Sequence, residues 1–402
     1  AALQRSPAVQ SARTGAQVAR AQQMSARSRL LPSLGASGSY TRNERAVTVP
    51  LGGAATAQQG LASEAPPVVI TPLNQLDLNL SLDVPLFDGA AFARGAAADS
   101  GVEAADAQLR ADLQSTLLAV AVAYHEAIAA RRVVEAAERS LEAARASESR
   151  LAARAAAGAA TTLAHLRAQA EVGRARQALA EAAAARAAAE RQLASLTGET
   201  APPSAGASTP RLEGLEGATA APRPELAAAR AALAQAQAQR AAAAWAYAPS
   251  LAARATERVT NAAGFAGAPA TWTVGATLSW RLFDSFGREA AIDEAGARVT
   301  QARARVDQLL RETGDAVENA RDRLAAAREK LAAAREERTA ADEAARIARK
   351  QLEEGASMPA DVALAERDAF SAAVNEIRAG ADLAIAVERL RHAAGLSMLE
   401  GA

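Results

Sequence analysis

Two stretches of the sequence, Leu76 to Phe87 and Thr271 to Phe283, alternate strictly between apolar and polar residues. A period of two over about ten residues predicts a strand with one apolar and one polar face. Both stretches run into Leu-Phe-Asp, which ends at Asp88 and Asp284, and both precede long alanine-rich segments. Few bulky residues remain to cover the apolar faces, so we expect lipid to cover them.

The alanine-rich segments predict very long helices. No proline and little glycine occur from Gly89 to Ala157, and at 1.5 Å per residue such a helix would be about 100 Å long. Asp88 is placed to cap its start. The segment Gly158 to Thr162 interrupts the pattern, which resumes from Leu163 to Leu196, and Gly198 is placed as a helix C-cap.

The first part of the chain is more varied. Residues 1–29 predict a helix, with Pro7 tolerated in its first turn and Pro32 ending it. Residues 34–41 alternate weakly and predict a second strand of the same hairpin. Residues 42–72 show no period and are rich in Gly, Ala, Pro and Gln, which predicts an exposed loop.

The plan of helix, strand, loop, strand, long helix, turn and helix occurs twice. Pro7 and Pro32 reappear as Pro224 and Pro249, and the glycines of the turns and caps reappear likewise. We therefore predict a first repeat at 1–198, with a β-hairpin at 34–87 and helices at 88–198. A linker at 199–223 precedes the second repeat at 224–402, with its β-hairpin at 250–283 and helices at 284–395.

Composition narrows the class of protein. Half of the 402 residues are hydrophobic but only 3% are aromatic, which suits long helices better than a bulky core. The net charge is zero, and the arginines alternate with acidic residues, which indicates solvated helix faces and no nucleic-acid partner. Cysteine is absent, so disulfides and thiolate sites are excluded. The sequence opens at Ala1 in mid-pattern, so any export signal would have preceded it.

Two hairpins supply four strands, and four strands cannot close a barrel around anything. An isolated copy would leave open sheet edges in contact with lipid, where unpaired backbone groups are intolerable. We therefore expect several copies to share one barrel.

The duplicated order of strand, Leu-Phe-Asp, long helix, Gly turn and helix resembles the TolC-type outer-membrane efflux proteins over essentially the whole chain. The resemblance implies a mainly α fold with transmembrane β: a homotrimer with a 12-stranded β-barrel in the outer membrane and a 12-helix α-barrel in the periplasm. It also implies a periplasmic adaptor protein and an inner-membrane pump as partners, and outer-membrane lipid around the barrel. We expect no cofactor.

The strand residues fit this placement. Trp272 and Trp280 lie on the apolar face, about 20 Å apart along the membrane normal at the usual strand tilt, as two interfacial aromatic girdles would. We expect the polar faces to line a water-filled lumen, with five candidate residues: Asp77, Asn79, Asp83, Ser279 and Arg281.

The resemblance assigns function to the two helical turns, whose tips dock on the adaptor in this family. The candidate contacts are Gly158, Thr161, Thr162, Gly355, Ser357 and Met358. Beyond the second turn, the family's first aperture aspartate matches Asp361, but the second falls on Leu364, so one ring of three carboxylates remains. The corresponding position of the first repeat is Ala164, which removes the counterpart of the polar lock of some members.

No catalytic pattern emerges. His125, His165 and His392 lie far apart on predicted helices without a nucleophile nearby, so we interpret each as a partly exposed helix residue. The leading hypothesis is a passive exit duct of a tripartite efflux system. The alternatives are the duct of a type I protein secretion system, which has the same architecture, and a soluble coiled-coil scaffold, which the tryptophan-bearing strand disfavours.

Overall fold

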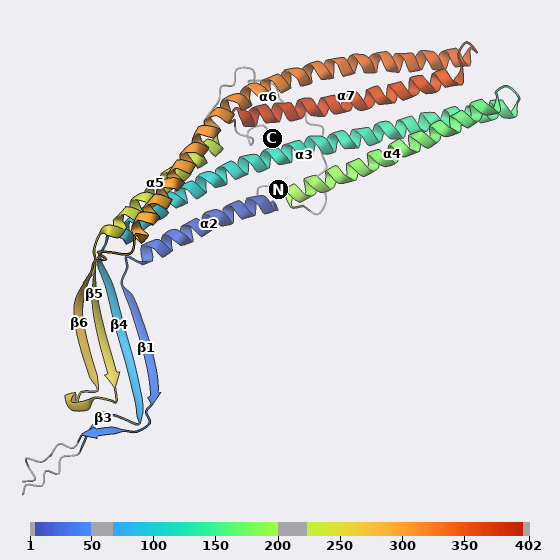
Figure 1. Ribbon diagram of the computed structural model, residues 1–402. Helices are drawn as coiled ribbons and strands as arrows, with labels where there is room; N and C mark the ends of the chain where they lie inside the picture. Colours follow the sequence, from blue (N-terminus) through green and yellow to red (C-terminus); the bar gives the residue numbers. More distant parts are fainter. Residues whose placement is uncertain (1–4, 50–66, 200–222, 397–402) are drawn as a thin grey trace, which may run out of the picture. The chain divides into compact units, whose positions relative to one another are not determined.

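The computed structural model describes residues 5–49, 67–199 and 223–396 (Figure 1). The described elements, in chain order, are α2 (Pro7–Ser28), β1 (Ser33–Arg42), β2 (Val47–Val49), β3 (Val68–Thr71), β4 (Asn74–Asp88), α3 (Gly89–Ala156), α4 (Thr162–Thr197), α5 (Pro224–Ala244), η2 (Trp245–Tyr247), β5 (Ser250–Thr260), η3 (Gly264–Ala266), β6 (Ala270–Ser279), α6 (Gly287–Glu353) and α7 (Pro359–Ala393). Apart from its end residues, the predicted linker 199–223 lies outside the described residues.

The chain divides into two compact units. One contains Ala1–Gln17, Ala104–Ala231 and Ala304–Ala402, and the other contains Val18–Glu103 and Ala232–Arg303. Each unit draws segments from both predicted repeats. The division into two repeats stays a prediction, because units defined by contacts in space do not test whether the sequence is duplicated.

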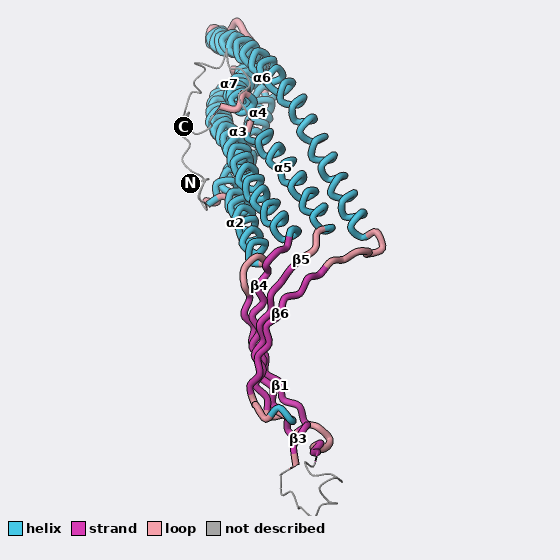
Figure 2. The backbone as a smooth tube through the Cα atoms, turned by 90° about the vertical axis from the view of Figure 1, so that its left-hand side faces the viewer, coloured by secondary structure: helices cyan, strands magenta, loops and turns pink. Residues whose placement is uncertain are grey.

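The second unit holds a four-stranded antiparallel sheet in the order β1-β4-β5-β6 (Figure 1). Figure 2 shows the same strands after a turn of 90° about the vertical axis. Its register places Leu34 opposite Leu82, Leu82 opposite Ala255, and Ala255 opposite Val274. Because neighbouring residues of a register share a face, the apolar residues of all four strands gather on one side of the sheet. The alternation predicted at 76–87 is confirmed as far as Pro85, where a bulge before Phe87 shifts the register. The alternation at 271–279 is confirmed, and β1 and β5 follow the same parity, with Glu257 the charged residue among the apolar positions of β5.

On β4 the apolar face is the more exposed of the two, and both faces of β1 and β6 are exposed. Along β4 the leucines from Leu76 to Leu82 are exposed, while the polar residues between them are half-buried. On β6, Val274 is 69% exposed and Leu278 is 67% exposed. Burial of apolar side chains is the usual driving force of folding, so an apolar face that the described residues leave uncovered indicates an interaction surface.

The first unit consists of helices packed through alanine and a few larger residues. Leu193 of α4 packs on Ala123 and Ala127 of α3, and Leu390 of α7 packs in a cluster with Val317 and Leu324 of α6. Alanine allows two helix backbones to approach closely, so a thin core suffices for two-helix hairpins. None of the described helices is both long and apolar enough to cross a membrane.

The predicted helix boundaries are confirmed to within a few residues. The Asp88 carboxylate accepts a hydrogen bond from the Ala91 amide at 2.9 Å, as an N-cap does. Gly198 adopts a φ of 70° and its amide donates to the Ala194 carbonyl at 2.9 Å, which closes α4.

Two predictions need correction. Strand β6 ends at Ser279 and not at Phe283, because the backbone leaves the sheet and turns through left-handed residues before α6 begins. The predicted loop 42–72 contains a two-stranded ladder between β2 and β3 in its described part, because Val47–Val49 and Val68–Thr71 are short β-branched runs that pair.

Candidate functional site

Ion pairs between β4 and β5 occupy the polar face of the sheet. The Arg258 guanidinium donates to Asp77 Oδ1 at 2.6 and 3.0 Å, and Arg254 Nε donates to Asp83 Oδ1 at 2.5 Å. Both arginines were missed in the sequence analysis, although each shares the parity of the polar positions of β5. The face predicted to line a lumen therefore carries paired charges of both signs.

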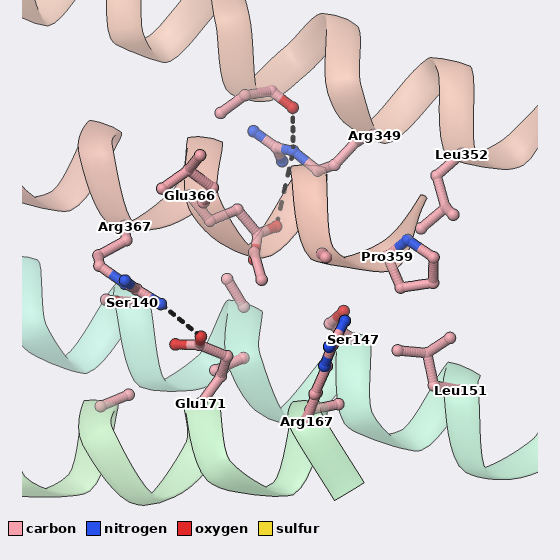
Figure 3. Close-up of a pocket in the computed structure, with 18 of the residues that line it drawn as sticks. Ser140, Ser147, Leu151, Arg167, Glu171, Arg349, Leu352, Pro359, Glu366 and Arg367 are labelled. Atoms are coloured by element: carbon pink, nitrogen blue, oxygen red, sulfur yellow. Dashed lines mark hydrogen bonds and ion pairs between the residues drawn. The ribbon is translucent and has the colours of Figure 1, made fainter. Parts of the chain in front are cut away.

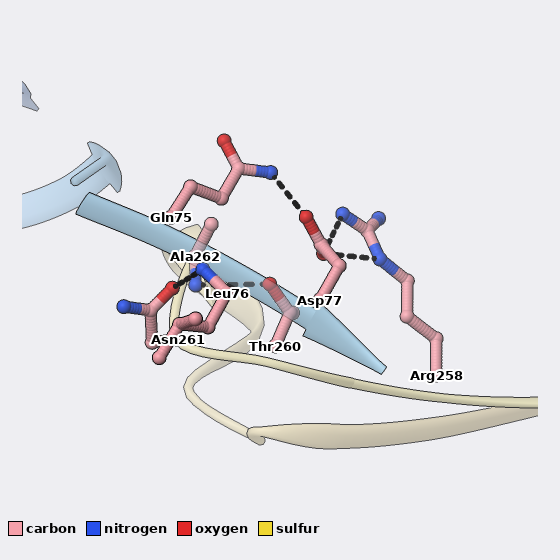
Figure 4. A network of polar contacts seen from close by, with 7 residues as sticks. All are labelled: Gln75, Leu76, Asp77, Arg258, Thr260, Asn261 and Ala262. Atoms are coloured by element: carbon pink, nitrogen blue, oxygen red, sulfur yellow. Dashed lines mark hydrogen bonds and ion pairs between the residues drawn. The ribbon is translucent and has the colours of Figure 1, made fainter. Parts of the chain in front are cut away.

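The end of the sheet near residues 74–77 is closed by a side chain that imitates backbone pairing. Asn261 Oδ1 accepts from the Leu76 amide at 2.8 Å (Figure 4). Asn261 Nδ2 donates to the Asn74 carbonyl at 2.7 Å. Gln75 Nε2 donates to Asp77 Oδ2 at 2.7 Å. Asp77 therefore accepts hydrogen bonds from Gln75 on its own strand and from Arg258 on β5, near the end of β5.

The other predicted strand residues have the following positions. Asn79 lies on the same face as Asp77, and Ser279 is the last residue of β6. Arg281 lies two residues beyond the end of β6, where it is exposed. The assignment of these residues to a lumen stays a prediction.

The two predicted interface tryptophans are exposed and differently held. Trp272 is 77% exposed and lies opposite Glu257 in the sheet register. Trp280 is 61% exposed and its indole N–H donates to the Tyr247 carbonyl at 3.1 Å. An apolar ring with a satisfied N–H suits a membrane interface.

The first helical turn, between α3 and α4, depends on glycine geometry and a threonine cap. Gly158 has a φ of 73°, which disfavours any residue with a side chain, although no atom lies near enough to clash with one. Thr161 caps α4, because its hydroxyl accepts from the Ala164 amide at 3.2 Å. Thr162 is the first residue of α4 and is exposed.

The second turn, between α6 and α7, uses an aspartate instead. Gly355 has a φ of 77°, and Met358 is the residue before α7. Asp361 Oδ2 accepts from the Met358 amide at 3.1 Å and lies 3.4 Å from the Ser357 hydroxyl. Asp361 therefore caps the helix that carries it, while Leu364, one turn further, is 53% exposed.

A cleft of about 1190 Å³ lies between the two hairpins in the tip-proximal part of the first unit (Figure 3). Arg367 of α7 donates to Glu171 Oε1 of α4 at 2.6 Å, and this bond links the two hairpins. Arg174 of α4 also binds Glu171. Arg349 lies 3.9 Å from Glu366, and both residues face the cleft.

Arginines outnumber carboxylates in the lining of this cleft. Of the lining residues, Glu171, Asp342 and Glu366 are acidic, and the basic ones are Arg139, Arg154, Arg167, Arg174, Arg338, Arg349 and Arg367. Within the described residues, Arg139, Arg154 and Arg167 form no ion pair. The cleft is therefore a basic surface in a chain of zero net charge.

The pKa values of the two half-buried glutamates of the cleft, Glu171 and Glu366, are shifted in opposite directions. Burial acts to raise the pKa of the Glu171 carboxyl, but the hydrogen bonds from Arg174 and Arg367 outweigh it and hold that pKa below its ordinary value. Burial raises the pKa of the Glu366 carboxyl, because Arg349 is too distant to compensate.

The histidines are half-buried helix residues, as predicted. His165 Nε2 lies 2.9 Å from Glu148 Oε1, and His392 Nε2 lies 3.2 Å from Glu225 Oε1. Burial lowers the pKa of His125. Among the described residues, no group of three potential metal ligands comes together.

Comparison with known proteins identifies the family. The model of the outer membrane efflux protein family matches residues 1–199 and 217–396. The chain belongs to the outer membrane efflux protein family. As a member it is a protein of the cell outer membrane with its helices in the periplasm. No curated protein matches the chain.

Solved structures of similar fold cover nearly all of this outer membrane efflux protein. A membrane protein from Pseudomonas aeruginosa is 23% identical with a TM-score of 0.79, over 98% of this chain and 91% of its own. The outer membrane protein VceC from Vibrio cholerae is 21% identical with a TM-score of 0.77, over 99% and 95%. The Campylobacter jejuni CmeC outer membrane channel is 17% identical with a TM-score of 0.79, over 98% and 84%. At these identities the likeness establishes the fold.

Proposed function

We propose that this outer membrane efflux protein is the passive exit duct of a tripartite efflux system. An inner-membrane pump supplies the energy, a periplasmic adaptor bridges the gap, and the duct provides a water-filled path to the exterior. The duct itself catalyses no reaction. The observation that carries the proposal is a sheet with an exposed apolar face and two free edges, β1 and β6.

The free edges require further copies of the chain. Edge strands present unpaired amides and carbonyls, which lipid cannot satisfy, so a membrane-embedded sheet must close on itself. Strand β1 of one copy would pair with β6 of the next, and three copies would give 12 strands. The near-equal lengths of α3 and α6 (68 and 67 residues) and of α4 and α7 (36 and 35 residues) support the proposed duplication and an evenly built 12-helix tunnel.

The tips and the basic cleft are the proposed docking region for the adaptor. The turns at Gly158 and Gly355 expose backbone and small side chains, which leaves room for a helical hairpin. The bond between Arg367 and Glu171 would hold the two hairpins together when the duct is closed, and its loss would allow α6 and α7 to move away. Asp361 would face the aperture in addition to capping α7.

Measuring the mass of the detergent-extracted oligomer and the conductance of planar bilayers tests the proposal. We expect a trimer and a low cation-selective conductance. Replacement of Asp361 by Asn keeps an oxygen that can accept from Met358, so the cap survives and the charge is lost. If conductance and cation block stay unchanged in Asp361→Asn, the aperture assignment is wrong; a monomer in detergent would overturn the duct itself.

A variant of the hairpin link sharpens the same measurement. Arg367→Gln should raise the open fraction of the channel, because one of the two arginines on Glu171 is lost. Arg346→Gln is the matched control, because Arg346 binds only Glu343 of its own helix among the described residues. Equal conductance of the two variants would contradict a role for the link in closure.

A further inference from the structure

The cleft between the two helical hairpins holds more arginines than its own carboxylates can pair with. Each acidic residue of the lining already pairs with an arginine of the lining; these residues are Glu171, Asp342 and Glu366. Three further arginines of the lining form no ion pair with any described residue: Arg139, Arg154 and Arg167. A half-enclosed space with an excess of guanidinium groups attracts anions.

The spacing of residues along the helices explains why these side chains share one space. Ser140, Ser147 and Arg154 recur at intervals of seven residues on α3, and Arg167 and Arg174 show the same interval on α4. Because seven residues are close to two full helical turns, each set lies on one face of its helix. The arginines therefore gather in the cleft, and they are not scattered around the helices.

Alanine keeps this space open. It is the commonest residue of the lining; Ala164 and Ala168 flank Arg167 on α4, and Ala345 precedes Arg349 by one turn on α6. Side chains of this size do not fill the gap between the hairpins, and about 1190 Å³ remains. Pockets for small molecules have volumes of about 300–1,000 Å³, so the cleft has room for a ligand.

Arginines of both hairpins reach into the cleft (Figure 3). Arg167 extends from α4 toward the hairpin of α6 and α7, and Arg349 extends from α6 toward Glu366. The Arg349 side chain is oriented by a hydrogen bond from its Nε to the Ala345 carbonyl at 3.1 Å. A ligand in the cleft would therefore meet positive charge from both hairpins.

We propose that this cleft binds a multivalent oxyanion, of the class of short polyphosphates, through arginines of both hairpins at once. A guanidinium group presents paired N–H donors that match two oxygens of a phosphate, so each arginine supplies charge-assisted hydrogen bonds. Ser140 and Ser147 add hydroxyl donors from α3. An anion with several phosphate groups can contact Arg167 and Arg349 together, whereas a single phosphate contacts fewer donors.

The bound anion would add a second connection between the hairpins. Arg367 of α7 and Glu171 of α4 already join them by a hydrogen bond. A ligand that binds one arrangement of a protein stabilises that arrangement, so the anion should oppose separation of the hairpins. The inference goes beyond the proposed duct and does not rest on it, because an anion can bind here without transport.

Equilibrium dialysis of the detergent-extracted full chain against sodium tripolyphosphate tests the proposal. Low ionic strength is used, because salt screens exposed charges. We expect a single tripolyphosphate per chain. Arg167→Gln and Arg349→Gln should each weaken its binding by about tenfold, the effect of losing a hydrogen bond between charged groups. Inorganic phosphate should bind at least about tenfold more weakly than tripolyphosphate, because it makes fewer of these bonds.

A matched control separates the cleft from the charge of the whole chain. The double variant Arg186→Gln with Arg346→Gln removes the same charge from α4 and α6 as Arg167→Gln with Arg349→Gln. Arg186 and Arg346 lie outside the cleft lining, and each binds a glutamate of its own helix. The control should bind tripolyphosphate as tightly as the wild type. If it loses as much affinity as the cleft variant, only the net charge attracts the anion, and the proposal is wrong.

The single variants test whether both hairpins contribute. Weaker binding in only one of Arg167→Gln and Arg349→Gln would mean that the anion contacts one hairpin, which overturns the shared site. A wild type that retains no tripolyphosphate overturns the site altogether. The duct proposal stands in either case, because it is tested by the oligomer and its conductance.

Folding of each variant is checked by circular dichroism. Arg167 forms no ion pair with a described residue, so Arg167→Gln should fold as the wild type does. Should Arg349→Gln fail to fold, Arg349→Lys replaces it, because lysine keeps the positive charge near Glu366 and lacks the paired N–H donors. Unchanged binding of tripolyphosphate to Arg349→Lys would then reject the contribution of the second hairpin.

Discussion

The two junctions between the sheet and the long helices share the letters Leu-Phe-Asp and differ in structure. At the first, β4 runs directly into α3, and Asp88 caps the helix within a continuous path. At the second, β6 ends early, Ser285 and Phe286 turn left-handed, and Asp284 binds Arg288 of α6. The same three residue types therefore support either a cap or an ion pair, depending on the residues around them.

The difference traces to Arg288. The corresponding position of α3, four residues after Asp88, is Phe92, an apolar residue that is 55% exposed. Because no arginine follows Asp88 at this spacing, the Asp88 carboxylate accepts from the Ala91 amide, and β4 continues directly into α3. Sequence symmetry in a repeat thus sets the order of elements, while a single charged residue decides the local path.

The largest effect is expected from Asp284→Ala. This change leaves Arg288 buried without its carboxylate, which should lower the free energy of unfolding by about 3–5 kcal/mol. Urea titration followed by helical circular dichroism measures it. The double variant Asp284→Ala with Arg288→Met removes both charges and should recover most of the loss. A single variant as stable as the wild type would mean that the ion pair does not hold the second junction.

The first residues of α3 and α6 give a matched pair of glycine changes. A Cβ on Gly89 would lie 2.4 Å from Trp245 Cε3, so Gly89→Ala should destabilise the protein by about 1–3 kcal/mol through overpacking. A Cβ on Gly287 would lie 3.6 Å from Asp284 Oδ2, an ordinary contact, so Gly287→Ala should be neutral or slightly stabilising. Equal thermal midpoints for the two variants would refute the close Trp245 packing.

Asp88→Ala tests the cap of the first junction. Loss of the hydrogen bond to the Ala91 amide should lower the free energy of unfolding by about 1 kcal/mol, less than the loss at Asp284. Asp88→Asn and Asp88→Ser retain a capping oxygen and should restore most of it. A larger loss in the free energy of unfolding for Asp88→Ala than for Asp284→Ala would contradict the proposed difference between the two junctions.

The smallest effect is expected from Tyr247→Phe, and it depends on pH. The hydroxyl of Tyr247 lowers the pKa of Glu289 below its ordinary value by donating a hydrogen bond to the carboxylate. Because the pKa of Glu289 is lower in the folded protein than in the unfolded chain, its ionised carboxylate stabilises the fold at pH values above the unfolded-state pKa. This stabilisation is lost as the pH falls through the folded-state pKa. The difference between wild type and variant should therefore be present at neutral pH and vanish in acid, as urea midpoints at several pH values would record.

Prediction from sequence succeeded where structure is periodic. The strand alternation, the helix lengths and the caps at Asp88 and Gly198 all depend on neighbouring residues, whose spacing is visible in one dimension. Prediction failed at residues 280–283, where alternation continues after the strand has ended. A side chain from the next helix redirects that backbone, and no local pattern announces it.

The candidate sites divide in the same way. The glycine turns at Gly158 and Gly355 were predicted from their position in the chain, because glycine adopts a positive φ without the steric cost that a side chain adds. The pairing of Arg258 with Asp77, which are 181 residues apart in the sequence, was not predicted. The hydrogen bond from Arg367 to Glu171, which joins residues 196 apart in the sequence, was not predicted either.

The sequence by itself therefore determined which segments are strands or helices, where they turn, and that one face of the sheet is apolar. Only the tertiary structure decided which charges meet across the sheet and between the hairpins, and which path the backbone takes from β6 to α6. The reason is physical: backbone conformation follows from side chains a few positions apart, whereas ion pairs require atoms within a few ångströms in space, and chain folding alone brings them there.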